Sequence, residues 1–248
     1  MSQYPRVYFE GVLSVGDPFS LEGDDAHHLI HVLRIKEGEV ALVFTDQGNE
    51  FLALVEKVES NSLKLRIREV KSSFEKSYKL VLVQAIPKSQ KMDWIVEKAT
   101  ELGVNEIYPV VTRRVVKKTT RIERWQKIAL AASKQSQRLS IPLIHPVQEW
   151  KDFLQTPENF DLSLMASLSA LTRQTLDQAV QKVAKINSVA LAIGPEGDFA
   201  PDEVKEAVRL GWILIDLGPL TLRTETAAVV GLAVLDHELR KRFTCIKE

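Results

Sequence analysis

The chain has 248 residues, enough for one large domain or for a small and a medium domain. Its 33 Lys and Arg residues balance 33 Asp and Glu residues, so no global charge favours nucleic acid and any such binding needs local basic patches. The single cysteine, Cys245, excludes an internal disulfide and is typical of a reducing compartment. Because no signal-peptide core and no apolar run of membrane length is present, we expect a soluble cytoplasmic protein.

The N-terminal region, up to about residue 70, alternates short apolar runs with turn residues. Residues 47–49 and 59–62 suit hairpin turns, because Gly and Asn tolerate positive φ. Asp24 or Asp25 is expected to cap a helical patch over residues 24–33, with Leu29, Val32 and Leu33 on one apolar face. Strands are predicted at residues 6–9, 40–45, 50–58 and 63–70. Short strands with this spacing indicate a small β-barrel.

The helical patch carries three histidines, His27, His28 and His31. Residues four apart share a helix face, but zinc needs three or four ligands, and no nearby Cys or acidic residue completes a known spacing. A structural or RNA-facing role is therefore favoured, and no metal site is expected. Arg34 and Lys36 follow the patch, where contact with phosphate and simple solvation of a loop are equally good interpretations.

From residue 78 the pattern changes to apolar strands that alternate with helices. The change follows a polar stretch at 71–77, which places a domain boundary between 1–73 and 74–248. This alternation indicates an α/β fold with a largely parallel sheet covered on both faces. Strands are predicted at 78–86, 106–111, 143–144, 161–167, 188–194 and 212–217, and helices at 92–102, 122–137, 148–154, 176–184, 201–210 and 222–242.

Two groups of basic residues lie in this second region. The first surrounds the connection after residue 111 and the start of the next helix, where cations gain little from the helix dipole. Contact with an external phosphate is therefore favoured over a solvated loop. The second group, Lys134, Gln135 and Arg138, lies at the end of that helix, where a basic residue suits the dipole and a structural role weighs more. The first group consists of Arg113, Arg114, Lys117, Lys118, Arg121 and Arg124.

Several common site motifs are missing from the sequence. It contains no glycine-rich dinucleotide or methyltransferase loop, no nucleotide-triphosphate loop and no nucleophile elbow. The candidate site is instead a pair of loops that follow two predicted strands near the end of the chain, where ligands of open α/β sheets bind. In the first loop Gly194 and Gly197 bracket Pro195 and Glu196, so the backbone can approach a ligand closely. The second loop leads into residues 223–225, Arg-Thr-Glu, at a helix start.

Motifs of one family occur in order along the chain. They are Ile-Gly-Pro-Glu-Gly at 193–197, Leu-Gly at 217–218, Leu-Arg-Thr-Glu-Thr-Ala at 222–227, and the segments 26–34, 98–104 and 132–138. In these motifs the sequence resembles the RsmE family of 16S ribosomal RNA (uracil-N3)-methyltransferases, part of the SPOUT superfamily. The resemblance covers nearly the whole chain.

The resemblance implies an N-terminal PUA-like β-barrel over 1–73 that binds RNA, and a C-terminal SPOUT domain over 74–248 with an α/β trefoil knot. It also implies a homodimer that uses S-adenosylmethionine to methylate 16S rRNA of the 30S ribosomal subunit. The implied cofactor-binding residues are Ala166, Ser167, Leu168, Ile193, Gly194, Pro195, Glu196, Gly197, Leu217, Gly218, Leu222 and Thr224.

The implied reaction methylates N3 of one uridine near the 3′ end of 16S rRNA, and this nitrogen must lose its proton. We expect Arg223 to stabilise the negative charge that develops on the uracil carbonyls, and Glu225 to orient Arg223 or the cofactor. Glu196 is expected to orient the loop or the substrate, with a purely structural role as an equal alternative. The expected RNA-binding residues are Arg34, Lys36, Arg113, Arg114, Lys117, Lys118 and Arg138.

The sequence departs from the family pattern at three places. Asp198 and Ala200 stand where Gly and Ser are usual, Leu220 and the following Thr replace an Arg-Ile pair, and Lys134 replaces Glu. The alternative functions are methylation of another RNA, such as tRNA or 23S rRNA, and RNA binding by a non-catalytic ribosome assembly factor.

Overall fold

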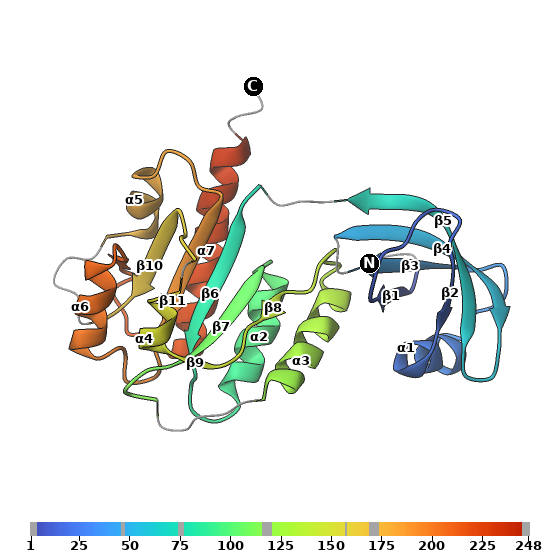
Figure 1. The fold of residues 1–248 in the computed structure, drawn as a ribbon, viewed down its shortest axis with the longest axis horizontal. Helices are drawn as coiled ribbons and strands as arrows, with labels where there is room; N and C mark the ends of the chain where they lie inside the picture. The colour runs from blue at the N-terminus through green and yellow to red at the C-terminus, as the bar shows by residue number, and fades with distance from the viewer. Residues whose placement is uncertain are drawn as a thin grey trace. The chain divides into compact units, whose positions relative to one another are not determined.

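The computed structural model of the chain describes residues 4–45, 48–73, 77–115, 121–156, 158–168 and 174–244. The chain forms two compact units (Figure 1). The first consists of Met1–Glu75 with Ser133–Ile141, and the second of Lys76–Ala132 with Pro142–Glu248. Three residues discussed above, Lys117, Lys118 and Cys245, lie outside the described residues.

The first unit is built on a curled five-stranded sheet with the order β1-β3-β4-β5-β2 (Figure 1). β1 pairs with β3 in parallel, and the other neighbouring strands are antiparallel. Alternate side chains of the longer strands, among them Phe51, Ala53 and Val55, join one apolar core. The strands are β1 (Arg6–Phe9), β2 (Pro18–Leu21), β3 (Val40–Thr45), β4 (Asn49–Val58) and β5 (Leu63–Ser73).

The helical patch of the first unit differs from its prediction. α1 (Gly23–His27) starts without a side-chain cap from either aspartate and continues as the π-helix η1 (His28–Val32). The wider π turn shifts the residues that follow around the helix axis. Leu29 is buried, whereas Val32 and Leu33 are 60% and 51% exposed. The predicted cap and the predicted apolar face after Leu29 are therefore wrong.

Residues 133–141 group with the first unit, although they begin in α3 (Ile122–Gln135), whose earlier residues belong to the second. Within this unit Lys134 forms an ion pair with Asp25 at 2.6 Å, and Arg6 donates a hydrogen bond to the Ser133 carbonyl at 3.0 Å. Lys134, one of the departures from the family pattern, thus has an acidic partner in this chain.

The second unit contains a parallel sheet with the order β12-β10-β11-β6-β7-β8, and β9 also pairs with β7 (Figure 1). Strand and helix bounds agree with the sequence prediction to within a few residues. The strands are β6 (Lys79–Ala85), β7 (Glu106–Val111), β8 (Leu143–Ile144), β9 (Gln148–Glu149), β10 (Leu162–Ala166), β11 (Ser188–Ile193) and β12 (Ile213–Ile215). The helices are α2 (Lys91–Glu101), α3 (Ile122–Gln135), α4 (Trp150–Phe153), α5 (Leu176–Gln181), α6 (Pro201–Arg209) and α7 (Thr224–Thr244).

The prediction of one helix over residues 148–154 is wrong. The first two of these residues extend the sheet as β9, and only the next four form the helix α4. The aromatic residues of α4, Trp150 and Phe153, are buried against Phe199 and Trp212, so tertiary packing rather than helical periodicity explains their apolar character.

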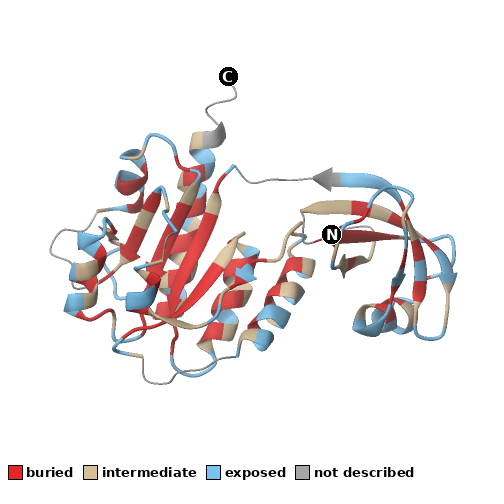
Figure 2. Ribbon diagram, in the orientation of Figure 1, coloured by how far each residue is buried: buried red, intermediate tan, exposed pale blue. Residues whose placement is uncertain are grey.

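Both faces of the parallel sheet are covered, and its strands are buried along most of their length (Figure 2). Val81, Val83 and Ala85 of β6 pack into the same cluster as α4 and α6. α7 lies against β6 and β11 and also contacts α2. Gly231 of α7 is needed for this packing, because a Cβ there would lie 2.8 Å from the Leu191 side chain.

The strand order places three loops at one edge of the sheet. β10 lies between β11 and β12, and all three strands are parallel, so the loops after them meet at their carboxyl ends. α7 begins directly after the third loop. None of the helices in the described part of the chain combines the length and the apolar character that crossing a bilayer requires.

Candidate functional site

A cavity of about 260 Å³ opens at the carboxyl ends of β10, β11 and β12. Its walls come from the three loops and from the first turn of α7. It is lined by Ala166, Ser167, Leu168, Ile193, Gly194, Pro195, Glu196, Asp198, Ile215, Asp216, Leu217, Gly218, Leu220, Thr221, Leu222, Arg223, Thr224 and Ala227.

The structure brings together almost the whole set of residues expected to bind a cofactor. All of them line the cavity except Gly197, whose Cα faces the Arg114 side chain instead. Arg223 also lines the cavity, but Glu225 does not. Asp198, Leu220 and Thr221, which depart from the family pattern, also lie on its wall.

Three lining residues were not expected at the site: Ile215, Asp216 and Ala227. Ile215 is the last residue of β12, which pairs with β10, and Asp216 follows it directly. The pairing of these two strands could have indicated both residues. Ala227 lies one helical turn after Arg223, on the same side of α7.

The turn after β11 has little free space. A Cβ at Gly194 would lie 3.1 Å from the Phe199 ring and 3.2 Å from Asp198, so a larger residue would displace the turn. The Asp198 backbone N–H donates to the Pro195 carbonyl at 2.9 Å and closes the turn. Asp198 adopts a φ of 59°, in the left-handed region that Asp and Asn tolerate better than most residues.

The Asp198 side chain connects two of the three loops. One carboxylate oxygen, Oδ2, accepts hydrogen bonds from the Ser167 hydroxyl and from the Leu168 backbone N–H, both at 2.9 Å. The loop after β10 is thereby attached to the turn after β11.

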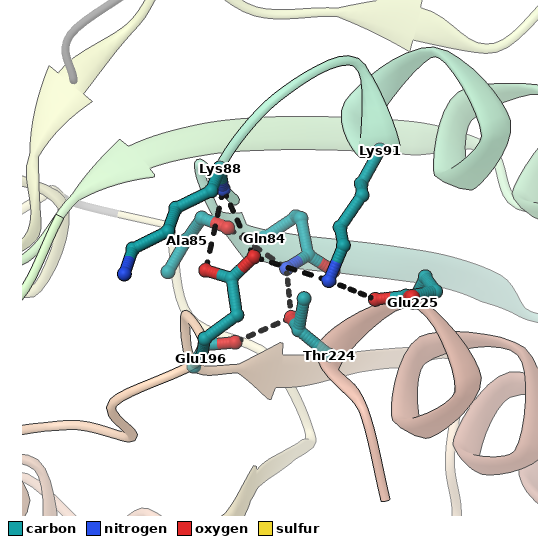
Figure 3. A network of polar contacts seen from close by, with 8 residues as sticks. Gln84, Ala85, Lys88, Lys91, Glu196, Thr224 and Glu225 are labelled. Atoms are coloured by element: carbon teal, nitrogen blue, oxygen red, sulfur yellow. Dashed lines mark hydrogen bonds and ion pairs between the residues drawn. The ribbon is translucent and has the colours of Figure 1, made fainter. Parts of the chain in front are cut away.

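Thr224 joins the start of α7 to the same turn. Its buried hydroxyl donates to the Gly194 carbonyl at 2.6 Å and accepts from the Gln84 amide at 3.1 Å (Figure 3). Gln84 also donates to the Ala85 carbonyl at 2.8 Å. The Thr224 side chain therefore shapes the wall of the cavity through bonds to the protein.

A network of charged residues lies beside the turn (Figure 3). Lys91 of α2 lies 3.2 Å from Glu196 and 3.1 Å from Glu225, and the Lys88 backbone N–H donates to both oxygens of Glu196. The hydrogen bond to Glu225 is the main cause that raises the pKa of Lys91. Burial disfavours the charged form of Glu196, but hydrogen bonds from its own N–H, Lys91 and Lys88 hold its pKa below the usual value.

Arg223 differs from these paired residues. It lies just before α7, it is exposed, and it forms part of the cavity wall. Within the described parts of the chain, no ion pair of its guanidinium is recorded. Arg223 is therefore placed to meet an anionic or electron-rich group that enters the cavity.

The residues expected to bind RNA have different surroundings. Arg113 pairs with Asp202 at 2.8 Å, and Arg114 donates a hydrogen bond to the Gly197 carbonyl. The Arg113 backbone N–H donates to Glu203, the residue that also accepts from the N–H at the uncapped start of α6. The two lysines of this group lie outside the described residues.

The other basic residues of the expected RNA-binding set lie in the first unit. Arg34 and Lys36 are exposed, and Arg34 adopts a φ of 55°. Arg138 is half-buried, and burial lowers its pKa to about 10. The rings of His27 and His31 lie 4.6 Å apart, and across the described residues no group of three or more His, Cys, Asp or Glu is placed to hold a metal ion.

Comparison of the sequence with known proteins gives independent evidence of the family to which the chain belongs. Residues 74–236 match the family model of an RNA methyltransferase domain, and residues 21–68 match that of an RNA methyltransferase PUA domain. The chain is 31% identical over 234 residues to ribosomal RNA small subunit methyltransferase E of Rickettsia conorii, which covers 93% of this chain and 94% of the relative.

Two further similarities extend this result. The protein of the same name from Mesomycoplasma hyopneumoniae is 33% identical over 205 residues, covering 81% of this chain and 86% of the relative. The crystal structure of ribosomal RNA small subunit methyltransferase E from Neisseria gonorrhoeae, bound to S-adenosyl methionine, matches with a TM-score of 0.84 at 27% identity, covering 95% of this chain and 98% of that one.

These comparisons confirm the expected α/β fold with an N-terminal PUA domain. The chain belongs to the RNA methyltransferase family and, within it, to the ribosomal RNA small subunit methyltransferase E proteins.

Proposed function

We propose that this protein transfers a methyl group from S-adenosylmethionine to N3 of one uridine near the 3′ end of 16S rRNA, in the cytoplasm. The observation that supports the proposal most strongly is the cavity, where three strand-end loops and Arg223 surround a single space of about 260 Å³. Family membership supports the reaction class, since the curated relatives are small-subunit rRNA methyltransferases.

The lining residues suit S-adenosylmethionine chemically. Ile193, Leu217, Leu222 and Ala227 form an apolar wall for the adenine ring, and the backbone groups of the glycine turns can bind its edge and the ribose. Carboxylates on the wall suit the positive charges of the cofactor. When bound, the sulfonium supplies a methyl group that is already activated.

Arg223 is the catalytic residue of this proposal. Removal of the N3 proton leaves negative charge on the uracil carbonyls, and the guanidinium at the cavity wall stabilises that charge as it develops. A base that takes the N3 proton contributes roughly 10²–10⁴-fold to the rate enhancement. Alignment of N3 with the methyl group supplies much of the rest of the enhancement.

Glu225 takes a positioning role rather than direct contact. It pairs with Lys91, which also pairs with Glu196, so the three residues hold the start of α7 next to the turn after β11. Arg223 lies two residues before Glu225, so the contacts that hold the start of α7 also place the backbone of Arg223. Thr224 and Asp198 complete the framework that keeps the three loops in place.

The proposal extends to the rest of the chain. Residues 1–73 are proposed as the PUA-like RNA-binding domain and 74–248 as the SPOUT domain, knotted at its C-terminus and paired in a homodimer. Exposed Arg34 and Lys36 are candidates for phosphate contact. Arg113, Arg114, Lys117, Lys118 and Arg138 complete the proposed RNA-binding set.

The test uses purified protein, cofactor labelled in its methyl group, and three substrates: 30S subunits, naked 16S rRNA and tRNA. We expect label in 16S rRNA, and comparison of the first two substrates identifies the form that the enzyme accepts. Label in tRNA alone would replace the proposed substrate. RNA binding without transfer to any substrate would favour an assembly factor.

A further inference from the structure

Asp198 occupies an unusual position for a carboxylate. Its backbone lies in the left-handed region, with a φ of 59°, and its side chain forms part of the wall between the loop after β10 and the turn after β11. Two hydrogen bonds to Oδ2, from the Ser167 hydroxyl and the Leu168 N–H, hold the carboxylate in place. The negative charge is therefore fixed at the cavity rather than free to turn into solvent.

The cavity has an uneven charge. Three carboxylates, Glu196, Asp198 and Asp216, line it together with one guanidinium, that of Arg223. Glu196 is balanced by Lys91 at 3.2 Å, and no basic side chain of the described residues is recorded as paired with Asp198. The negative charge that remains on the cavity wall favours binding of a positively charged ligand.

The two forms of the cofactor differ by one positive charge. S-adenosylmethionine carries a sulfonium, whereas transfer of the methyl group leaves S-adenosylhomocysteine, a neutral thioether with the same adenosine and amino-acid groups. Shape and hydrogen bonding hardly distinguish the two molecules. A fixed negative charge distinguishes them, because it attracts the form with the charged sulfur more strongly.

We propose that Asp198 is a specificity-determining residue that makes the cavity prefer the charged sulfonium cofactor over its neutral thioether product. The inference rests on the proposed function, since it assumes that the cavity holds the cofactor. The preference has a consequence for turnover. Methyl transfer removes the positive charge that Asp198 attracts, so S-adenosylhomocysteine is bound less tightly than S-adenosylmethionine and dissociates more easily.

The test compares two binding constants in wild type and in Asp198→Asn, measured by titration calorimetry. Asparagine accepts the same hydrogen bonds from Ser167 and Leu168 and tolerates the same backbone conformation, so the variant removes the charge alone. We expect the ratio of Kd for S-adenosylhomocysteine to Kd for S-adenosylmethionine to fall about 3- to 10-fold, as expected for one charge at a partly solvated wall.

Two further variants complete the design. Asp202→Asn removes an exposed carboxylate on α6 that does not line the cavity, and its ratio should equal that of wild type. Asp198→Gly removes both the charge and the loop contact on a backbone that glycine adopts readily, so it gives a second measurement of the charge effect. The ratio should fall in this variant as well, while both ligands bind more weakly.

The outcomes separate the inference from the function on which it rests. If wild type binds both ligands and the ratio is unchanged in both Asp198 variants, Asp198 serves only to hold the loop, and the charge inference is overturned. If wild type binds neither ligand, the proposed function itself fails.

Discussion

The two ends of the parallel sheet use carboxylates in different ways. At the amino end, carboxylates join neighbouring strands directly: Glu106 of β7 pairs with Lys79 of β6 at 2.6 Å and with His145 at 3.0 Å. Asp161, just before β10, accepts hydrogen bonds from the backbone N–H groups of Asn187 and Ser188 at the start of β11.

At the carboxyl end the same kind of contact runs from loop to loop around a cavity. Asp198 connects two loops, Thr224 attaches α7 to one of them, and Lys91 bridges two glutamates. Contacts at the amino end of the sheet therefore contribute stability, whereas contacts at the carboxyl end also pre-arrange a site. Changes at the amino end should therefore affect unfolding alone, whereas changes at the carboxyl end should affect cofactor binding or transfer.

The largest effect is expected from Arg223→Ala. The variant lacks the positive group that stabilises the negative charge developing on uracil, so kcat should fall about 10²- to 10³-fold. Cofactor affinity should change little, because the apolar walls and the glycine turns remain. Steady-state transfer to 16S rRNA or 30S subunits measures the first effect and calorimetry the second.

The control for this variant is Arg209→Ala, which removes an exposed arginine of α6 that pairs with Glu206 away from the cavity. It should transfer methyl groups at the wild-type rate. Equal rates for Arg223→Ala and wild type would show that Arg223 takes no part in catalysis.

Thr224→Val should have the next largest effect. The change keeps the volume of the side chain but leaves the Gly194 carbonyl and the Gln84 amide without their buried partner, which costs about 1–3 kcal/mol of unfolding free energy. Cofactor affinity should fall as well, because the turn after β11 loses its attachment to α7. Denaturant unfolding and calorimetry measure the two effects.

Thr226→Val is the matched control, since Thr226 is exposed on the same helix. Thr224→Ser should restore both properties because it returns the hydroxyl. If Thr224→Val binds the cofactor as wild type does, the attachment of α7 is not needed to shape the site.

Glu106→Gln tests the amino end of the sheet. Burial disfavours the charged form of Glu106, but hydrogen bonds with His145 and Lys79 outweigh it and lower the pKa to about 2, from the usual 4.5. Because the pKa is lower in the folded protein, this stabilisation is present above about pH 4.5 and is lost as the pH falls towards 2. After allowance for partial exposure, about 1–2 kcal/mol is expected at pH 7.

Denaturant unfolding of wild type and Glu106→Gln between pH 7 and pH 3 measures this contribution. The difference between the two proteins should shrink as the pH falls, while cofactor affinity at pH 7 stays the same. A pH-independent difference, or a loss of cofactor affinity, would contradict the assignment of this end to stability alone.

Lys91→Gln should have the smallest effect. Its ion pairs with Glu196 and Glu225 are partly exposed to solvent, so the change should cost at most about 1 kcal/mol of unfolding free energy. A fall of a few fold in kcat is expected because the start of α7 is held less firmly. Lys98→Gln on the same helix, which removes pairs with Glu97 and Glu101, should leave kcat unchanged.

Much of the second unit could be predicted from sequence, because parallel strands are apolar throughout and helices have a clear period. The turn at 194–197 and the start of α7 were identifiable from glycines and from their place after strands. Asp198 shows the limit of prediction from sequence. The sequence indicates an added charge at this position, but only the fold shows that the charge faces the loop after β10.

The remaining features depend on contacts between distant residues. Glu225 resembles an ordinary acidic residue in a first helical turn, and its partner Lys91 lies on another helix. Arg113 and Arg114 are predicted to contact phosphate, but the sequence does not indicate that they also contact Asp202 and Gly197. In the first unit, the π-helix changes which residues are buried, and no periodicity indicates such a change.

The most direct test of the account is the identity of the methylated atom. 16S rRNA from subunits incubated with the enzyme and S-adenosylmethionine is digested to nucleosides, which are then separated and weighed by mass spectrometry. We predict one 3-methyluridine per rRNA with wild type, and formation of the same nucleoside about 10²- to 10³-fold more slowly with Arg223→Ala. Methylation of a ribose hydroxyl, of another base, or of uridine at a carbon atom would contradict the proposed chemistry.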